Sequence, residues 1–298
     1  MPSIVARKTG SRNRLLKGDF AASGKITALT AYDFIFAKIL DACGIDIILV
    51  GDSVATIVQG YENTLPVSLD EMVYHCRCVS RAVTRALVVG DLPFMSYQSS
   101  SDRALESAGR LIKEGGVAAV KLEGGIFVAQ AIEKIVQCDI PVMGHVGLTP
   151  QSFHRMGGHK LQGRVKGDRL TLKAGSRERI IEDALAVEGA GAFAVVLEGM
   201  PAELAAEITE RLSVPTIGIG AGLGCDGQIL VTHDMLGMNP DFRPKFVKAY
   251  ADLSDTISQA VKSYMHEVRQ DLFPAPQHTF SGSAPRGDAP KRTRLKVV

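Results

Sequence analysis

Four short apolar segments of this chain each end in an acidic residue, and their recurrence constrains the fold more than any other feature. Short runs rich in Ile, Leu and Val are typical of strands that are buried on both faces. Because the carboxyl ends of parallel strands meet on one face of a barrel, we expect the acids to surround one pocket. The segments 47–52, 87–91, 119–123 and 194–198 end in Asp52, Asp91, Glu123 and Glu198.

Strand and helix patterns alternate through most of the chain. Eight strand-like runs can be placed, the first at 26–32 and the last at 228–232, with helical stretches between them. Alternation predicts a parallel sheet, and eight units predict a closed (βα)8 TIM barrel. An open doubly wound sheet is the alternative, which the lack of a dinucleotide-binding fingerprint disfavours.

Local signals predict where two of the helices begin. Asp33 is the expected N-cap of a helix that ends before Gly44. Ser68 and Glu71 have the spacing of a capping box, in which two side chains satisfy free N–H groups of the first turn. These signals place the helices that follow the first two strands.

Length and composition set the domain organisation. With 298 residues, 46% of them hydrophobic, the chain has the material for one large barrel core. We assign residues 25–272 to a single barrel domain, residues 1–24 to an N-terminal arm and residues 273–298 to a disordered C-terminal tail.

Charge, hydropathy and the number of cysteines limit which classes of partner and which cellular compartment fit this chain. A formal net charge of +2 without a basic stripe argues against nucleic acid, and no apolar run reaches the ~18 residues of a membrane span. The five cysteines lack the regular spacing of a disulfide framework, which indicates reduced thiols and a cytoplasmic setting. A basic N-terminus that lacks acids before Asp19 makes mitochondrial targeting the alternative.

Three of the strand-end acids are candidates for a metal site. Asp52, Asp91 and Glu123 follow the second, third and fourth strands, which are neighbours in a barrel. Adjacent oxygen ligands of this kind suit Mg²⁺, which also keeps positions open for water or substrate. The alternative is that each acid caps a helix or pairs with a lysine.

Three further residues are candidates for contact with a substrate. Lys121 shares a strand face with Glu123, so it could anchor a substrate carboxylate, form a Schiff base or neutralise the acids. Glu198 lies apart from the metal candidates and suits a general base, with a helix cap as the structural alternative. His145 ends the fifth strand and could hydrogen-bond a substrate oxygen or be a satisfied core residue.

Two loops add candidate binding elements. The glycines at 218, 220, 222 and 224 could cradle a phosphate or let the backbone approach a flat or extended ligand. The long loop 147–173 follows a strand at the face where barrels place lids and binding residues.

Several motifs follow one another in order along the chain, among them Leu29-Thr-Ala-Tyr-Asp33, Gly51-Asp-Ser53, Asp91-Leu-Pro-Phe-Met95, Lys121-Leu-Glu-Gly-Gly125, Gly144-His-Val-Gly-Leu-Thr-Pro-Gln151 and Gly218-Ile-Gly-Ala-Gly222. Taken together across residues 25–250, these motifs closely resemble the ketopantoate hydroxymethyltransferase family. Members of that family have (βα)8 subunits, and the resemblance implies a barrel of the phosphoenolpyruvate/pyruvate type. Gly199-Met200 and the extra residues at 164–173 depart from the family pattern without removing a functional position.

The resemblance implies an activity and a role for each site residue. It implies transfer of a hydroxymethyl group from 5,10-methylenetetrahydrofolate to 3-methyl-2-oxobutanoate, giving 2-dehydropantoate for pantothenate and coenzyme A synthesis. The family's catalytic base corresponds to Glu198, and its members assemble as homo-oligomers, so we expect an octamer or a decamer. Its Mg²⁺ ligands correspond to Asp52, Asp91 and Glu123, and its oxoacid contacts to Asp52, Ser53, Asp91 and Lys121.

Three other functions stay open at this point. A Mg²⁺-dependent oxoacid carbon–carbon lyase of the isocitrate-lyase or phosphoenolpyruvate-mutase type would share the fold and the metal but use no folate. A non-catalytic ligand-binding barrel would need no metal. A Schiff-base aldolase would use Lys121 as its nucleophile.

Overall fold

The structure is a computed structural model that describes residues 24–156, 161–163, 175–240 and 244–280. Its centre is a closed barrel of eight parallel strands in sequence order, in which β1 pairs with both β2 and β8. The predicted (βα)8 barrel is confirmed. The strands are β1 (Ile26–Thr30), β2 (Ile47–Val50), β3 (Leu87–Asp91), β4 (Ala119–Glu123), β5 (Val142–Gly147), β6 (Ala194–Glu198), β7 (Thr216–Ile219) and β8 (Gly227–Leu230).

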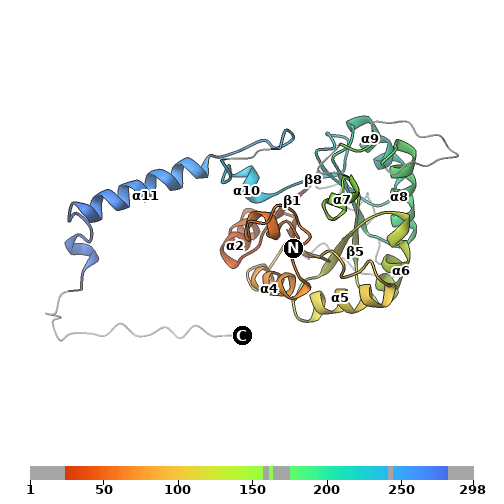
Figure 1. The fold of residues 1–298 in the computed structure, drawn as a ribbon, viewed down its shortest axis with the longest axis horizontal. Coiled ribbons are helices and arrows are strands. Elements are labelled where there is room, and N and C mark those ends of the chain that lie inside the picture. Colours follow the sequence, from red (N-terminus) through yellow and green to blue (C-terminus); the bar gives the residue numbers. More distant parts are fainter. Residues whose placement is uncertain (1–23, 157–160, 164–174, 241–243, 281–298) are drawn as a thin grey trace. The chain divides into compact units, whose positions relative to one another are not determined.

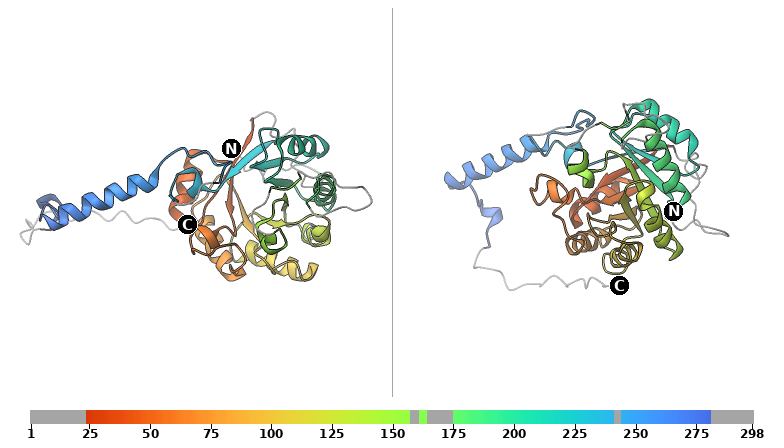
Figure 2. Two further views of the ribbon diagram at one scale, coloured as in Figure 1. Left: turned by 45° about the horizontal axis from the view of Figure 1, so that its top comes forward. Right: turned by 45° about the vertical axis from the view of Figure 1, so that its right-hand side comes forward.

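The longer helices between the strands form a ring around the barrel (Figure 1), and two further views show the strands at the centre of this ring (Figure 2). Shorter helices lie in the loops. In chain order the helices up to β8 and just beyond it are α2 (Phe34–Cys43), α3 (Val54–Ile57), α4 (Leu69–Ser80), α5 (Ser101–Lys113), α6 (Ala129–Gln137), α7 (Phe153–Met156), α8 (Arg177–Gly189), α9 (Ala202–Arg211) and α10 (Thr232–Met235).

Both predicted helix starts are confirmed. Asp33 caps α2 by accepting hydrogen bonds from two backbone N–H groups of the first turn, and Gly44 ends the helix in the left-handed conformation. Ser68 and Glu71 form the predicted capping box of α4. Caps of this kind each stabilise a helix by about 1 kcal/mol.

An apolar layer fills the barrel interior below the polar ends of the strands. Because side chains alternate between the two faces of a strand, residues two positions apart point into the same lumen. On β3, Val89 belongs to this layer and Asp91 comes next on the same face. On β4, Ala119 belongs to the layer, and Lys121 and Glu123 follow it. The alternation therefore places these three polar side chains in the lumen above the apolar layer.

The connection between β7 and β8 is a loop, residues 220–226, and contains no helix. Gly222 and Gly224 let the loop lie against α9, since a Cβ at these positions would lie 2.5 Å from that of Ala202 and 2.8 Å from that of Ala206. Both glycines therefore have a packing role. The sequence had suggested only ligand-binding roles for the glycines at 218, 220, 222 and 224.

Gly224→Ala is expected to lower the free energy of unfolding by about 1–3 kcal/mol, because the added methyl group overlaps Ala206. Urea denaturation measures this change. Gly109→Ala on α5 is the matched control, since nothing lies within 4 Å of its added Cβ, and it should stabilise the protein by up to about 1 kcal/mol. Unchanged stability in Gly224→Ala would contradict close packing of the loop on α9.

Asp41 ties α2 to the segment that enters β3. Its carboxylate accepts hydrogen bonds from the backbone N–H groups of Thr84, Arg85 and Ala86, at 2.9, 3.1 and 2.8 Å, and from the Thr84 hydroxyl at 2.9 Å. Burial alone would raise the pKa of Asp41, but these hydrogen bonds outweigh burial and hold the pKa below its ordinary value.

Asp41→Asn is expected to cost about 1–3 kcal/mol of unfolding free energy at neutral pH, because the amide turns a donor toward backbone N–H groups. Since the folded-state pKa is depressed, the stabilisation is fully present above the ordinary aspartate pKa of about 3.9 and is lost as the pH falls through the lower folded-state value. Urea titrations of the two proteins should therefore converge at low pH. Asp102→Asn, at an exposed position of α5, is the control. A gap that does not change with pH would contradict the assignment.

Residues 252–298 form a unit separate from residues 1–251. This unit contains α11 (Leu253–Arg269) and a 3-10 turn, η3 (Pro276–His278), and no side chain of α11 is buried. The division falls before α11, whereas the sequence assigned residues through 272 to the barrel. The predicted arm, apart from Gly24, and residues 281–298 of the predicted tail lie outside the described residues.

In the described part of the chain, no helix combines the length and the hydropathy that a membrane span requires.

Candidate active site

Polar side chains from four strands gather at the carboxyl end of the barrel. Asp91 ends β3, Lys121 and Glu123 lie at the end of β4, and Glu198 ends β6. The parallel register places Asp91 opposite Lys121, and Glu123 opposite His145 of β5. The structure therefore brings together residues that are far apart in the sequence.

Asp52 and Ser53 join this cluster from the first residues after β2. The N–H of Asp52 donates to Oδ2 of Asp91 at 3.1 Å. The Ser53 hydroxyl lies 2.8 Å from the hydroxyl of Tyr32, which follows β1. Asp52 and Tyr32 are both buried. The Ser53 hydroxyl therefore has the buried Tyr32 hydroxyl as its partner and lies next to the buried acid Asp52.

Lys121 is a buried cation among these acids. Its Nζ lies 2.5 Å from Oδ1 of Asp91 and 3.8 Å from Oε1 of Glu123. Burial lowers the pKa of Lys121, but the neighbouring carboxylates outweigh burial and leave the pKa above its ordinary value. A protonated ammonium suits neutralisation and anion binding, whereas Schiff-base formation needs the free amine.

The buried acids outnumber the cations beside them. Burial and then repulsion by Asp91 and Glu123 raise the pKa of Asp52. Burial also raises the pKa of Asp91, although Lys121 opposes this change. Carboxylates held this close favour either a shared proton or a bound cation. The electrostatics therefore suit a positively charged ligand.

His145 lies between two carboxylates. Its Nδ1 is 3.4 Å from Oε1 of Glu123 and its Nε2 is 3.2 Å from Oε2 of Glu198, although neither contact has the alignment of a hydrogen bond. Burial lowers the pKa of His145, but the two carboxylates outweigh burial and raise the pKa to about 9. The two carboxylates therefore favour the positively charged form of the ring, which links Glu198, whose side chain is 15% exposed, to the buried acids.

Tyr97 and Gln151, which the sequence did not single out, complete the cluster. Tyr97 lies in the loop after β3, and Gln151 lies in a 3-10 turn, η2 (Pro150–Ser152), after β5. Both are buried, and Gln151 donates hydrogen bonds to Asp52 and Glu123. The periodic patterns that predict strands and helices do not predict the positions of loop residues. The one sequence signal that could have identified Gln151 was its place in the motif 144–151.

The cluster fits a divalent cation by its charge rather than by a preformed ligand set. Among the residues that the structure describes, no three His, Cys, Asp or Glu side chains converge as such a set. Asp52 and Asp91 are adjacent, while Glu123 faces His145 and accepts from the N–H of Gln151 at 3.0 Å. Mg²⁺ commonly takes one or two carboxylates and fills its other positions with water and substrate, so an adjacent pair of acids is compatible with this ion.

Solved barrels of the phosphoenolpyruvate mutase and isocitrate lyase superfamily share this fold. A phosphonopyruvate hydrolase in complex with oxalate and Mg²⁺ superposes with a TM-score of 0.56 at 11% identity, covering 88% of this chain and 91% of the other. A 2,3-dimethylmalate lyase of that superfamily superposes with a TM-score of 0.55 at 16% identity, covering 88% of each chain. The protein thus shares the (βα)8 barrel fold of these solved structures, with an acidic centre at the carboxyl ends of its strands.

Sequence comparison then gives the family. The family model for ketopantoate hydroxymethyltransferase matches residues 14–276. The 3-methyl-2-oxobutanoate hydroxymethyltransferases of Geobacter metallireducens and Geobacter sulfurreducens are each 57% identical to this chain over 261 residues, 88% of this chain and 95% of the relative. The chain belongs to the ketopantoate hydroxymethyltransferase family, as its motifs predicted, and is a hydroxymethyl-transferring enzyme.

Proposed function

We propose that this enzyme transfers a hydroxymethyl group from 5,10-methylenetetrahydrofolate to 3-methyl-2-oxobutanoate, giving 2-dehydropantoate for pantothenate and coenzyme A synthesis. The arrangement of the acids supports this most directly. Asp52, Asp91 and Glu123 are buried together, while Glu198 faces them across His145 with part of its side chain exposed. Such a cluster offers a cation-binding centre and, separately, a carboxylate that can take a proton.

Mg²⁺ is the proposed metal, and Asp52, Asp91 and Glu123 are the residues that would hold it. When bound, Mg²⁺ polarises the 2-oxo group and stabilises the negative charge that develops when C3 loses its proton. The excess of buried negative charge supports this assignment, as do the raised pKa values of Asp52 and Asp91.

The side chains around the acids would bind the oxoacid and move its proton. The ammonium of Lys121 faces the oxoacid's carboxylate, the Ser53 hydroxyl donates a hydrogen bond to the oxoacid, and His145 donates to a substrate oxygen. Glu198 accepts the proton from C3 of the oxoacid. The electron pair left on C3 forms the new carbon–carbon bond to the one-carbon unit, and the two carbon–nitrogen bonds that hold this unit on the folate break. Water supplies the oxygen of the hydroxyl group, and the two nitrogens of the departing tetrahydrofolate take up the proton from C3 and one proton of water.

Substrate dependence tests this reaction. The purified protein with Mg²⁺, 3-methyl-2-oxobutanoate and 5,10-methylenetetrahydrofolate should form 2-dehydropantoate and tetrahydrofolate in equal amounts, and omission of the folate should stop the reaction. Cleavage of an oxoacid without folate would instead indicate a carbon–carbon lyase. Oxoacid binding without turnover, and without any need for Mg²⁺, would indicate a ligand-binding barrel.

We also propose that the enzyme works in the cytoplasm as a homo-oligomer, an octamer or a decamer. Helices that expose several large apolar side chains to water are unfavourable unless another surface covers them. Light scattering during gel filtration measures the mass, and a mass equal to one chain would contradict an assembly. The exposed apolar side chains are Phe34, Ile35 and Ile39 on α2, and Ile257, Val261, Tyr264, Met265 and Val268 on α11.

A further inference from the structure

The side chain of Gln151 uses all of its polar positions inside the protein. Its Nε2 donates to Oδ2 of Asp52 and to the carbonyl oxygen of Leu92, both at 2.9 Å. Its Oε1 accepts from the Tyr97 hydroxyl at 2.7 Å and from Nε2 of Gln98 at 3.0 Å. Because a carbonyl can only accept, the contact with Leu92 fixes which end of the amide is the nitrogen. Asp52 therefore faces an obligatory donor.

The backbone of the same residue contacts a second acid. The N–H of Gln151 donates to Oε2 of Glu123 at 3.0 Å. The hydroxyl of Tyr97 lies 3.0 Å from the carbonyl oxygen of Glu123 and 3.1 Å from its N–H. One residue from the loop after β5 thus contacts the acids that follow β2 and β4, and Tyr97 from the loop after β3 contacts both Gln151 and Glu123.

We propose that Gln151 is a positioning residue of this active site, which holds the carboxylates of Asp52 and Glu123 in the orientation that binds the cation and the oxoacid. This role rests on the proposed function, which assigns the cation and the oxoacid to those acids. By donating to Oδ2 of Asp52, the amide leaves Oδ1 as the oxygen available to a ligand. Partners of this kind restrict the rotation of a ligating carboxylate and tune its affinity for the metal.

A role in packing alone would lead to a different result. Loop packing by Gln151 affects how much free energy is needed to unfold the protein, but not how tightly the folded protein binds a cation. A positioning role affects the affinity of the folded protein, measured well below its melting temperature. The affinity for a metal ion therefore separates the two roles, and it does so without reference to turnover.

Gln151→Met keeps the length of the side chain and removes the side-chain hydrogen bonds, including the one to Asp52, while the backbone N–H still donates to Glu123. Titration with Mn²⁺ followed by electron paramagnetic resonance should show binding about 10–100-fold weaker than in the wild type. Tyr97→Phe leaves the donors of Gln151 in place but removes the hydroxyl that orients the amide, and should weaken Mn²⁺ binding by about 3–10-fold. Gln137→Met, the same change at an exposed position of α6, is the matched control and should bind Mn²⁺ like the wild type.

The outcomes distinguish this role from the proposed function itself. Wild-type Mn²⁺ affinity in folded Gln151→Met would overturn the positioning role and leave the proposed function intact. If Gln151→Met does not fold, Tyr97→Phe decides, and wild-type affinity in that variant would overturn the role. Failure of the proposed function would be visible in the wild-type protein, which would then neither bind Mn²⁺ nor convert the two substrates.

Discussion

Glu198→Gln should nearly abolish exchange of the C3 hydrogen of 3-methyl-2-oxobutanoate with solvent, while the oxoacid still binds. An amide cannot accept the proton, and a general base typically contributes about 10²–10⁴-fold, so we expect the exchange rate to fall by a factor in that range. The described contact of Glu198 with the cluster is through Nε2 of His145 at 3.2 Å, so the buried acids keep their partners. Proton NMR of the oxoacid in deuterated water with Mg²⁺ measures the exchange, and calorimetry measures binding.

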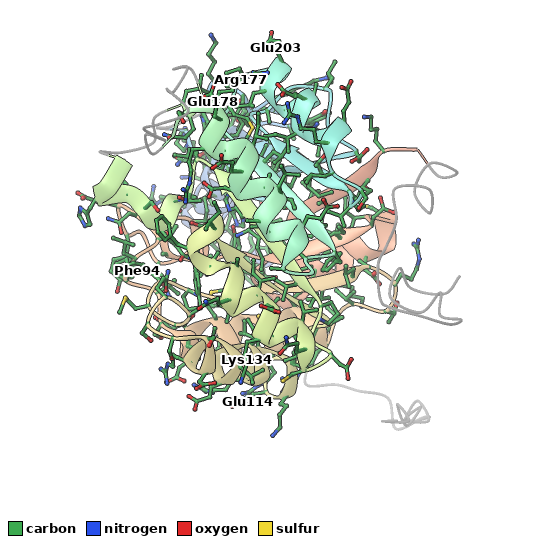
Figure 3. The ribbon with its side chains drawn as sticks, turned by 90° about the vertical axis from the view of Figure 1, so that its right-hand side faces the viewer. Phe94, Glu114, Lys134, Arg177, Glu178 and Glu203 are labelled. Carbon is green, nitrogen blue, oxygen red and sulfur yellow. The ribbon has the colours of Figure 1, made fainter. Side chains whose placement is uncertain are left out.

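The matched control is Glu203→Gln in the first turn of α9, where Figure 3 shows Glu203 at the outer edge of the helix. This variant should exchange the C3 hydrogen at the wild-type rate, because it removes a carboxylate of the same kind away from the barrel centre. Exchange at the wild-type rate in Glu198→Gln would remove Glu198 as the base.

Lys121→Met should lose both oxoacid affinity and stability. Its ammonium is buried 2.5 Å from Oδ1 of Asp91. Removing one partner of a buried ion pair costs about 3–5 kcal/mol of unfolding free energy. Loss of a charged contact to the bound oxoacid costs about 2–5 kcal/mol, or about 30- to 5,000-fold in affinity. Urea denaturation and calorimetric titration with the oxoacid measure the two effects separately.

Lys134→Met is the control for the lysine change, because the side chain of Lys134 on α6 is 43% exposed, with its Nζ 3.4 Å from Asp102. It should alter neither the affinity nor, beyond a few tenths of a kcal/mol, the stability. Wild-type oxoacid affinity in Lys121→Met would limit Lys121 to neutralising the acids. Borohydride added with the oxoacid should leave no adduct on the wild-type enzyme, and a reduced adduct on Lys121 would contradict its protonated state.

The gathering of these acids could be predicted because their positions follow from strand geometry alone. Asp91, Glu123 and Glu198 each end a strand, and parallel strands of a barrel end on one face. Lys121 could be placed in the lumen because it lies two residues before Glu123. None of these positions depends on the shape of a loop.

The other features of the site and the fold depend on the conformation of loops or on which element a surface packs against. Short-range sequence patterns carry information about neither. Tyr97 and Gln151 meet the acids only because two loops fold back over the strand ends. Glycines at 222 and 224 indicate that the backbone packs closely against another element, but they do not identify that element as α9. The apolar stripe of α11 has the same period whether or not the helix packs on a core.

Calorimetric titration of the wild-type enzyme with 3-methyl-2-oxobutanoate, with Mg²⁺ and then with EDTA, tests most directly whether acids from separate strands form one centre for a cation and an oxoacid. We expect tight oxoacid binding only with Mg²⁺, because two ligands that share a centre strengthen each other's binding by the same factor. In Asp91→Asn, which removes one of the acids proposed to hold Mg²⁺, most of this Mg²⁺ effect on oxoacid affinity should be lost. Equal oxoacid affinity with Mg²⁺ and with EDTA would contradict a shared centre.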